Sequence, residues 1–204
     1  MTFCGVFRNE ALNVRRVLDI AKELEMEIKV VVQESEDATL SICKEYGEVF
    51  EHPAQSPEAS KDFLIQQVKP GWTFWLDADE VPSLPLIEFV SSFNEETFAK
   101  WDGIIVRRIN YINGLHIEEN TGVDWQFRLL KSTVRWDIEN QPYTIHINPV
   151  VPDSKRFTLK GFPLYHHRSL EKIERTTKRW NELEPRTAEY CNDYLRKVKS
   201  HFKK

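Results

Sequence analysis

The chain has 204 residues, of which 41% are hydrophobic and 29% charged, and this composition fits one globular domain with a substantial core. Its net charge of −4 gives no global electrostatic case for binding nucleic acid. Three widely spaced cysteines, without a Cys-x-x-Cys pair, argue against a disulfide scaffold or a structural zinc and favour reduced thiols in a cytoplasmic protein. The sequence shows no signal peptide and no apolar run of about 18 residues, which predicts no transmembrane segment.

Residues 1–51 predict alternating strands and helices. Apolar runs and amphipathic spacing indicate a β-α-β-α-β order, which requires a parallel, doubly wound sheet. Asn9 is a natural N-cap for the first helix. The predicted elements are strands at 3–7, 28–32 and 48–51, a helix with an apolar face over 14–24, and a helix over 35–46.

A short acidic stretch follows the most apolar run of the chain. Residues 72–76 are uncharged and mostly bulky, which favours a central parallel strand buried on both faces, and Asp77, Ala78, Asp79 and Glu80 come next. Ligands of open α/β sheets bind beyond the carboxyl ends of the strands, and alternation would place Asp77 and Asp79 on one side. Because two adjacent carboxylates repel, we expect a Mg or Mn ion between them that stays partly open to a substrate phosphate. A solvated acidic turn is the alternative.

The segments on either side of this strand have weaker signals. Residues 52–60 contain two prolines and little to bury, which predicts a mobile loop that closes as a flap over a bound ligand. A helix is predicted over 63–68, and Ser83 is expected to cap another helix that ends near Phe93.

The second half of the chain changes character. Residues 101–111 are strand-like, and Asn113-Gly114 is a strong hairpin signal. Further elements are predicted as strands around 126–131, 143–148 and 157–165, a helix that starts at Ser169 and stops at Pro185, and a last helix that turns Cys191, Leu195, Val198 and Phe202 inward.

Taken in order, these motifs resemble the GT-A fold of nucleotide-sugar glycosyltransferases, and among them the inverting, family-2-type enzymes that include lipopolysaccharide-core transferases. The resemblance spans residues 3–170, and compact members encoded by large algal viruses, which decorate capsid glycans, are similar. The stretches that carry it are Phe7-Arg8-Asn9-Glu10, residues 35–39, Trp75-Leu76-Asp77-Ala78-Asp79-Glu80, residues 108–114, Asp124-Trp-Gln-Phe-Arg128-Leu129 and His166-His167-Arg168-Ser169.

The resemblance implies a single GT-A type α/β domain over residues 1–204 with a mixed central sheet. Its parts would be a Rossmann-like, nucleotide-sugar-binding half over 1–100, an acceptor-side half over 101–168 and C-terminal helices over 169–204. The implied reaction moves a sugar from a nucleotide diphosphate sugar, with a UDP-sugar as the expected donor, to a glycan or glycoprotein acceptor with inversion. Trp101 and Trp125 could stack on acceptor sugars, although core packing is the commoner fate of a tryptophan. Whether the chain is one domain of a longer polypeptide stays open.

For the donor site, the resemblance implies a divalent ion, Mn or Mg, that bridges the two phosphates and stabilises the departing diphosphate. Asp79 is the first expected ligand, and Asp77 is expected to contact the ribose or to bind the ion through water. Relatives often add a histidine from the C-terminal part of the chain, which indicates His166 or His167. The residues expected to contact the nucleotide are Phe7, Arg8, Asn9, Glu10, Asp77 and Ala78.

Inverting transfer also requires a carboxylate that accepts the proton of the acceptor hydroxyl. Asp124 is the expected base because its Asp-Trp-Gln-Phe-Arg-Leu context resembles the base element of the family. Asp137, Glu139 and His146 are chemical alternatives. The structural alternative for Asp124 is a hairpin residue paired with Arg128.

The chain departs from the resembling family at two places. Val32-Gln33 stands where the family usually has an aspartate, which puts uracil or ribose contacts there in doubt. Ile145-His146-Ile147 lacks the carboxylate of a Val-His-Glu element that is common in the relatives.

Three other functions fit parts of the sequence. Asp77-Ala-Asp79-Glu-Val81 matches the start of a haloacid-dehalogenase-type phosphatase motif, but the chain has no Gly-Asp dipeptide for the downstream acidic element. A nucleotidyltransferase would share the sheet and the metal, yet it typically has a glycine-rich phosphate loop where Gly5 stands alone. A non-catalytic sugar-nucleotide-binding module is the remaining alternative.

Overall fold

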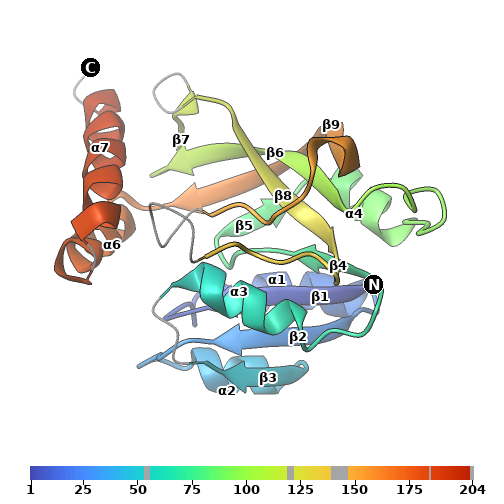
Figure 1. The fold of residues 1–204 in the computed structure, drawn as a ribbon. Coiled ribbons are helices and arrows are strands. Elements are labelled where there is room, and N and C mark those ends of the chain that lie inside the picture. The colour runs from blue at the N-terminus through green and yellow to red at the C-terminus, as the bar shows by residue number, and fades with distance from the viewer. Residues whose placement is uncertain (53–55, 119–121, 139–146, 184, 203–204) are drawn as a thin grey trace.

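The computed structural model of the protein describes residues 1–52, 56–118, 122–138, 147–183 and 185–202, which include one mixed sheet of nine strands (Figure 1). The strands are β1 (Thr2–Phe7), β2 (Glu27–Val32), β3 (Glu48–Glu51), β4 (Trp72–Trp75), β5 (Glu80–Pro82), β6 (Gly103–Ile112), β7 (Leu115–His116), β8 (Asp124–Lys131) and β9 (Arg156–Arg168). The helices are α1 (Val14–Glu23), α2 (Thr39–Lys44), α3 (Pro57–Ile65), α4 (Leu84–Ser91), α6 (Leu170–Leu183) and α7 (Pro185–His201), with a 3₁₀ turn at Asp153–Lys155.

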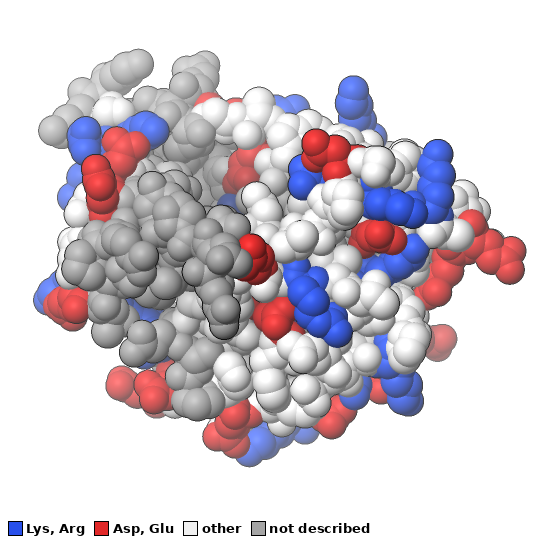
Figure 2. Space-filling model, in the orientation of Figure 1, with Lys and Arg blue, Asp and Glu red and all other residues white. Residues whose placement is uncertain are grey.

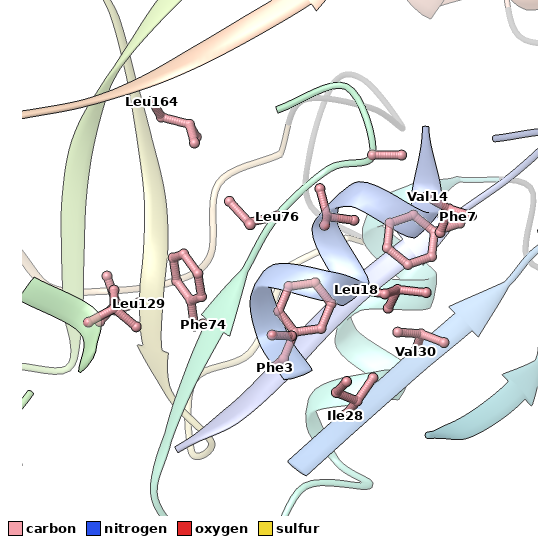
Figure 3. Packing of buried hydrophobic residues seen from close by; sticks show 14 of the residues in the cluster. Phe3, Phe7, Val14, Leu18, Ile28, Val30, Phe74, Leu76, Leu129 and Leu164 are labelled. Atoms are coloured by element: carbon pink, nitrogen blue, oxygen red, sulfur yellow. The ribbon is translucent and has the colours of Figure 1, made fainter. Parts of the chain in front are cut away.

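The N-terminal half is the doubly wound unit that the sequence predicts. Its strands run in parallel in the order β3-β2-β1-β4. The apolar face of α1 lies on this sheet, where Leu18 and Val14 pack among Phe3, Phe7 and Val30 (Figure 3). Burial of these side chains fixes the helix against the strands and leaves the carboxyl ends of β1 and β4 side by side at one edge.

Strand β4 joins the two halves of the sheet. It pairs in parallel with β1 and antiparallel with β8, and all four of its residues are buried, as its apolar sequence predicts. Beyond β8 the order continues β6-β9-β5, with β6 parallel to β9 and antiparallel to β8. Phe74 and Leu129 meet across the junction in the core (Figure 3). The predicted mixed central sheet is therefore confirmed.

The two C-terminal helices, α6 and α7, lie against each other beside the far ends of β6 and β9 (Figure 1). A separate apolar cluster of Ile112, Ile117, Ile173 and Val198 fixes them to the sheet. Ser169 accepts a hydrogen bond from the backbone N of Lys172 at 3.0 Å, so the predicted start of α6 is confirmed. No helix among the described residues has both the length and the apolar character that a membrane crossing requires.

Three local predictions are wrong. Asn9 does not cap α1, which starts at Val14: it has a φ of 52° and accepts a hydrogen bond from Glu36 N at 2.8 Å. The helix predicted over 35–46 covers only α2, because Asp37 accepts hydrogen bonds from Thr39 N and from Ala11 N and holds a turn instead. Residues 57–60 of the predicted loop belong to α3, and the predicted flap lies partly outside the described residues, at 53–55.

In the second half the hairpin at Asn113-Gly114 is confirmed. Both residues have positive φ, 49° and 80°, which suits a tight two-residue turn between β6 and β7. The strand predicted around 143–148 lies mostly outside the described residues. Strand β5 was not predicted; it forms directly after the acidic stretch by pairing with β9.

Candidate active site

The acidic stretch forms the turn between β4 and β5 at the carboxyl end of β4. Three hydrogen bonds fix this turn: Glu80 N donates to Asp77 O at 3.0 Å, Asp77 N donates to Glu80 Oε2 at 3.0 Å, and Arg16 from α1 donates to Ala78 O at 3.2 Å. Asp77 and Asp79 therefore lie in a turn and not on one face of a strand. Their carboxylates meet different partners.

Asp77 faces the cations of the second half of the sheet. Its Oδ2 accepts a hydrogen bond from Arg128 at 3.0 Å and lies 3.8 Å from Arg108, and its Oδ1 lies 3.9 Å from Lys61 of α3. Burial by itself would raise the pKa of this carboxyl, but Lys61 and Arg128 outweigh burial and hold the pKa below its usual range. Asp77 is ionised at neutral pH, and its side chain is 33% exposed.

Glu80, for which no role was predicted, fixes the turn in place. Its side chain is fully buried and is bonded to Arg128 and, at 3.2 Å, to Arg108. Opposite charges from two different strands thus surround the carboxylate, which is the condition for burying it without a severe penalty. The turn is held in place by ion pairs that need no ligand.

Asp79 is also buried and faces the C-terminal segment. Its Oδ1 lies 3.3 Å from His166 Nε2, and its Oδ2 lies 3.0 Å from Lys172 Nζ and 3.9 Å from Arg168 Nε. Lys172 Nζ also contacts Glu10 Oε1, at 2.5 Å, in the segment that follows β1. Burial would raise the pKa of Asp79, but His166 and then Lys172 and Arg168 outweigh it and hold the pKa well below its ordinary value.

A hydrogen-bonded chain links Asp79 to the predicted base. Asn110 donates from Nδ2 to Asp124 Oδ2 at 3.1 Å, so its Oδ1 faces His166 Nδ1 at 2.7 Å. Nδ1 is therefore the donor in this pair, and Nε2 faces Asp79.

Asp124 itself is held from three sides. Arg108 donates to Oδ2 at 2.7 Å, Gln126 donates to Oδ1 at 2.6 Å, and Asn110 completes the set. Burial would raise its pKa, but Arg108 and the donors of Gln126 and Asn110 lower it. The alternative that paired Asp124 with Arg128 is wrong about the partner. Asp124 pairs with Arg108, whereas Arg128 pairs with Asp77 and Glu80.

The fold places the other residues predicted for the donor site in different surroundings. The side chain of Phe7 is buried in the core, and Arg8, Asn9 and Glu10 follow at the carboxyl end of β1, beside the acidic turn. His167 is exposed and stacks on Tyr111, so His166 is the histidine that the structure brings to Asp79.

The residues predicted for the acceptor side also differ in how exposed they are. Trp101 is half-buried and packs on Phe157, whereas Trp125 is 39% exposed. Of the alternative bases, Asp137 is half-buried, and Glu139 and His146 lie outside the described residues.

A divalent ion would find two protein ligands here. The carboxylate of Asp79 and Nε2 of His166 face each other; the carboxylate suits Mn or Mg, whereas the imidazole suits Mn better than Mg. Among the described residues no group of three or more His, Cys, Asp and Glu side chains could hold a metal ion. Asp79 and His166 by themselves would leave the other positions around such an ion to water and phosphate oxygens, as is usual for Mg at phosphate sites.

A small pocket opens beside Asp77 on the side of the second half. Its walls combine charged and amide groups with indole rings. The residues that line it are Lys61, Trp75, Asp77, Gln126, Phe127, Arg128, Leu130, Trp136, Ile147, Asn148 and Pro149.

The sequence profile of glycosyl transferase family 2 matches residues 3–173, from β1 into α6, and so covers every residue of the site. The chain belongs to glycosyl transferase family 2. It has the GT-A fold, as the sequence motifs implied. No curated protein matches the chain in sequence.

Solved structures of S. aureus TarS are similar in fold. One superposes with a TM-score of 0.55 at 14% identity, over 96% of this chain and 43% of the TarS chain. TarS 1-349 in complex with UDP-GlcNAc gives 0.54 at 14% identity over 82% of this chain and 59% of that one. TarS 1-349 in complex with UDP gives 0.53 at 13% identity over 100% and 72%. The chain therefore spans less than half of the first of these TarS chains.

Proposed function

We propose that this domain transfers a sugar from a UDP-sugar to a glycan or glycoprotein acceptor with inversion and with the help of a divalent ion. The observation that carries the proposal is the Asp79–His166 pair, which lies at the carboxyl end of a central strand in a family 2 domain. Ligands of α/β sheets bind in this position. The TarS structures with UDP and UDP-GlcNAc support a uridine donor.

Different residues of the chain would contact different parts of the donor. The carboxyl end of β1, with Arg8, Asn9 and Glu10, would lie against the uridine, and Asp77 would contact the ribose or a bound water. Asp79 and His166 would hold the Mn or Mg ion, and such an ion supplies Lewis-acid stabilisation of the departing diphosphate when bound. His166 is oriented for this task because Asn110 fixes its Nδ1.

Asp124 is the proposed base for the acceptor hydroxyl. Its lowered pKa means that it is ionised at neutral pH, as a base must be, and it lies outside the pair that would hold the metal. Its bonds to Arg108 and Gln126 also make it a weak base in this state. The proposal therefore requires that the acceptor hydroxyl take the place of one of these donors.

The three buried, free cysteines support the expectation of a cytoplasmic enzyme, because thiols stay reduced in that compartment. They lie in β1, α2 and α7, and all three are free thiols.

The test is turnover with UDP-, GDP- and TDP-sugars, with Mn and with EDTA. Slow release of nucleoside diphosphate that depends on Mn supports the proposal. Release of pyrophosphate would indicate a nucleotidyltransferase, and binding without turnover would indicate a sugar-nucleotide-binding module.

Asp79→Asn makes the metal test specific. We expect Mn-dependent release to fall on the order of 100-fold, which is the loss of one strong electrostatic contact. Asp153→Asn, at a carboxylate with 92% exposure of its side chain, is the matched control and should keep full activity. Full activity in EDTA would refute the metal.

A further inference from the structure

The side-chain ammonium of Lys172 lies between two carboxylates of the proposed donor site. Its Nζ lies 2.5 Å from Glu10 Oε1 and 3.0 Å from Asp79 Oδ2, and so bridges the segments that follow β1 and β4. Opposite charges on both sides favour the ammonium form of this group. The two carboxylates are thus neutralised by the chain itself.

A metal ion bound to Asp79 would lie close to this ammonium and would be repelled by it. Asp79 offers one oxygen to His166 and the other to Lys172. A Mg-type ion binds carboxylate oxygen at about 2.1 Å, so it would lie within a few ångströms of Nζ and repel it. A donor, however, brings a diphosphate whose oxygens are strong partners for an ammonium.

The geometry allows Lys172 to change partners while its helix stays in place. The next residue, Ile173, is 2% exposed and packs with Ile112, Ile117 and Val198, which fixes the first turn of α6. The Lys172 side chain is 23% exposed and has a flexible four-carbon stem. Arg168 remains beside Asp79 at 3.9 Å and would keep that carboxylate compensated after the ammonium leaves.

We propose that Lys172 is a mobile counter-ion of the donor site: it neutralises Glu10 and Asp79 in the empty enzyme and moves onto the diphosphate when donor and divalent ion bind. This role rests on the proposed function, since it requires a nucleoside diphosphate. Lys172 is then a donor-positioning residue that also keeps the ion from binding strongly before the donor arrives.

The test uses two affinities that should change in opposite directions. In Lys172→Met, Mn alone should bind about tenfold more tightly, because a like charge next to the ion is gone. UDP in saturating Mn should bind about tenfold more weakly, because one charge-assisted contact to phosphate is lost. Mn binding is measured by the electron paramagnetic resonance of free Mn, and UDP binding by calorimetry.

Two further variants control for structure and charge. Lys178→Met removes an exposed lysine of the same helix and should leave both affinities unchanged. Lys172→Gln keeps hydrogen-bonding groups without the charge and should reproduce both changes, which secures the test if Lys172→Met fails to fold.

Several results would overturn the role of Lys172. Equal affinities in wild type and variant contradict it, and so does a decrease in both, which indicates a structural role. Wild-type UDP binding that is insensitive to EDTA but lost in Lys172→Met would show that the lysine replaces the metal, and would also overturn the exchange. A wild-type protein that binds no nucleoside diphosphate contradicts the proposed function itself, whereas the other results leave that function intact.

Discussion

At the scale of single residues, the buried carboxylates of the site differ in whether the cations paired with them can change partners. Glu80 is fully buried between Arg108 and Arg128, and its contacts need no ligand. Asp79 is compensated by a flexible lysine and a histidine, both of which can change partners. The expected repulsion between neighbouring aspartates is thus relieved by the protein's own cations. Glu80 therefore holds the turn in place, whereas Asp79 is the carboxylate that is proposed to bind the ion.

The residue-scale prediction concerns Asp124. Asp124→Asn keeps the shape but removes the basicity, so sugar transfer should fall by roughly 100- to 10,000-fold. Binding of UDP with Mn should stay nearly unchanged, since Asp79 and His166 are intact. Kinetics of transfer and calorimetry of UDP binding measure the two effects separately.

The same substitution also weakens the contact with buried Arg108, so its stability must be measured as well. Urea unfolding shows whether the variant is folded at the assay temperature. Near-normal transfer by a folded Asp124→Asn protein would refute its role and favour Asp137, Glu139 or His146.

At the scale of elements, α3 and α4 both start with a serine cap and a proline in the first turn, but only the cap of α4 was predicted. Ser83 caps α4 as expected, by accepting a hydrogen bond from Leu86 N. Ser56 caps α3 in the same way, with Pro57 in the first turn, but the two prolines of 52–60 indicated a loop. Proline is favourable in the first turn of a helix because its missing N–H has no intrahelical partner there. The wrong loop prediction therefore has a local cause.

The element-scale prediction is a cap deletion. Ser83→Ala removes the side-chain acceptor at the start of α4 and should lower the free energy of unfolding by about 1 kcal/mol. Ser92→Ala, at the exposed end of the same helix, should change it by less than about 0.5 kcal/mol. Thermal or urea unfolding of both proteins measures the difference, and equal losses would contradict the capping role.

At the scale of the whole molecule, the two halves share one core through β4 and β8. Leu129 is fully buried at this junction, so Leu129→Ala should cost about 2–5 kcal/mol. Tryptophan fluorescence and far-UV circular dichroism should still report a single transition, because β4 pairs with strands of both halves.

Leu12→Ala is the control for this experiment, since its side chain is 98% exposed and should contribute less than about 0.5 kcal/mol. Two separate transitions in the wild type would contradict a shared core. Figure 2 adds that acidic and basic side chains are interspersed over the described part of one face, so neither sign dominates that surface.

The site also predicts how the whole molecule responds to acid. The pKa values of Asp77, Asp79 and Asp124 are lower in the folded protein than the ordinary value of 3.8. The unfolded chain therefore binds more protons below about pH 4, and the stability from these groups, fully present above that pH, is lost as pH falls through the folded pKa values. Urea unfolding between about pH 6 and about pH 3 should show this loss.

Asp79→Asn should make the loss shallower, since one of the three groups no longer titrates. Asp153→Asn, at an exposed carboxylate, is the control for removing a single charge. An acid profile of Asp79→Asn that is parallel to the wild type would contradict a compensated carboxylate at this position.

The sequence by itself determined the elements whose signals are local. Apolar runs, helical periodicity and the Asn113-Gly114 turn predicted most strands and helices, and the jump from apolar to acidic residues located the site. Resemblance to the family added the His166–His167 pair, but could not choose between its members. Alternation along β9 puts the two on opposite faces, and only the pairing with β6 shows that His166 faces inward.

Tertiary structure alone decided which charges meet. Arg108 and Arg128 reach the acidic turn because β6 and β8 pair side by side, and Lys172 reaches Asp79 and Glu10 from 93 and 162 residues away in sequence. No local pattern encodes such contacts, since each depends on strand order, register and helix docking together. The balance of buried charge, and with it the chemistry of the site, is therefore a property of the assembled fold, because a carboxylate's partners are set by distance in space and not by distance along the chain.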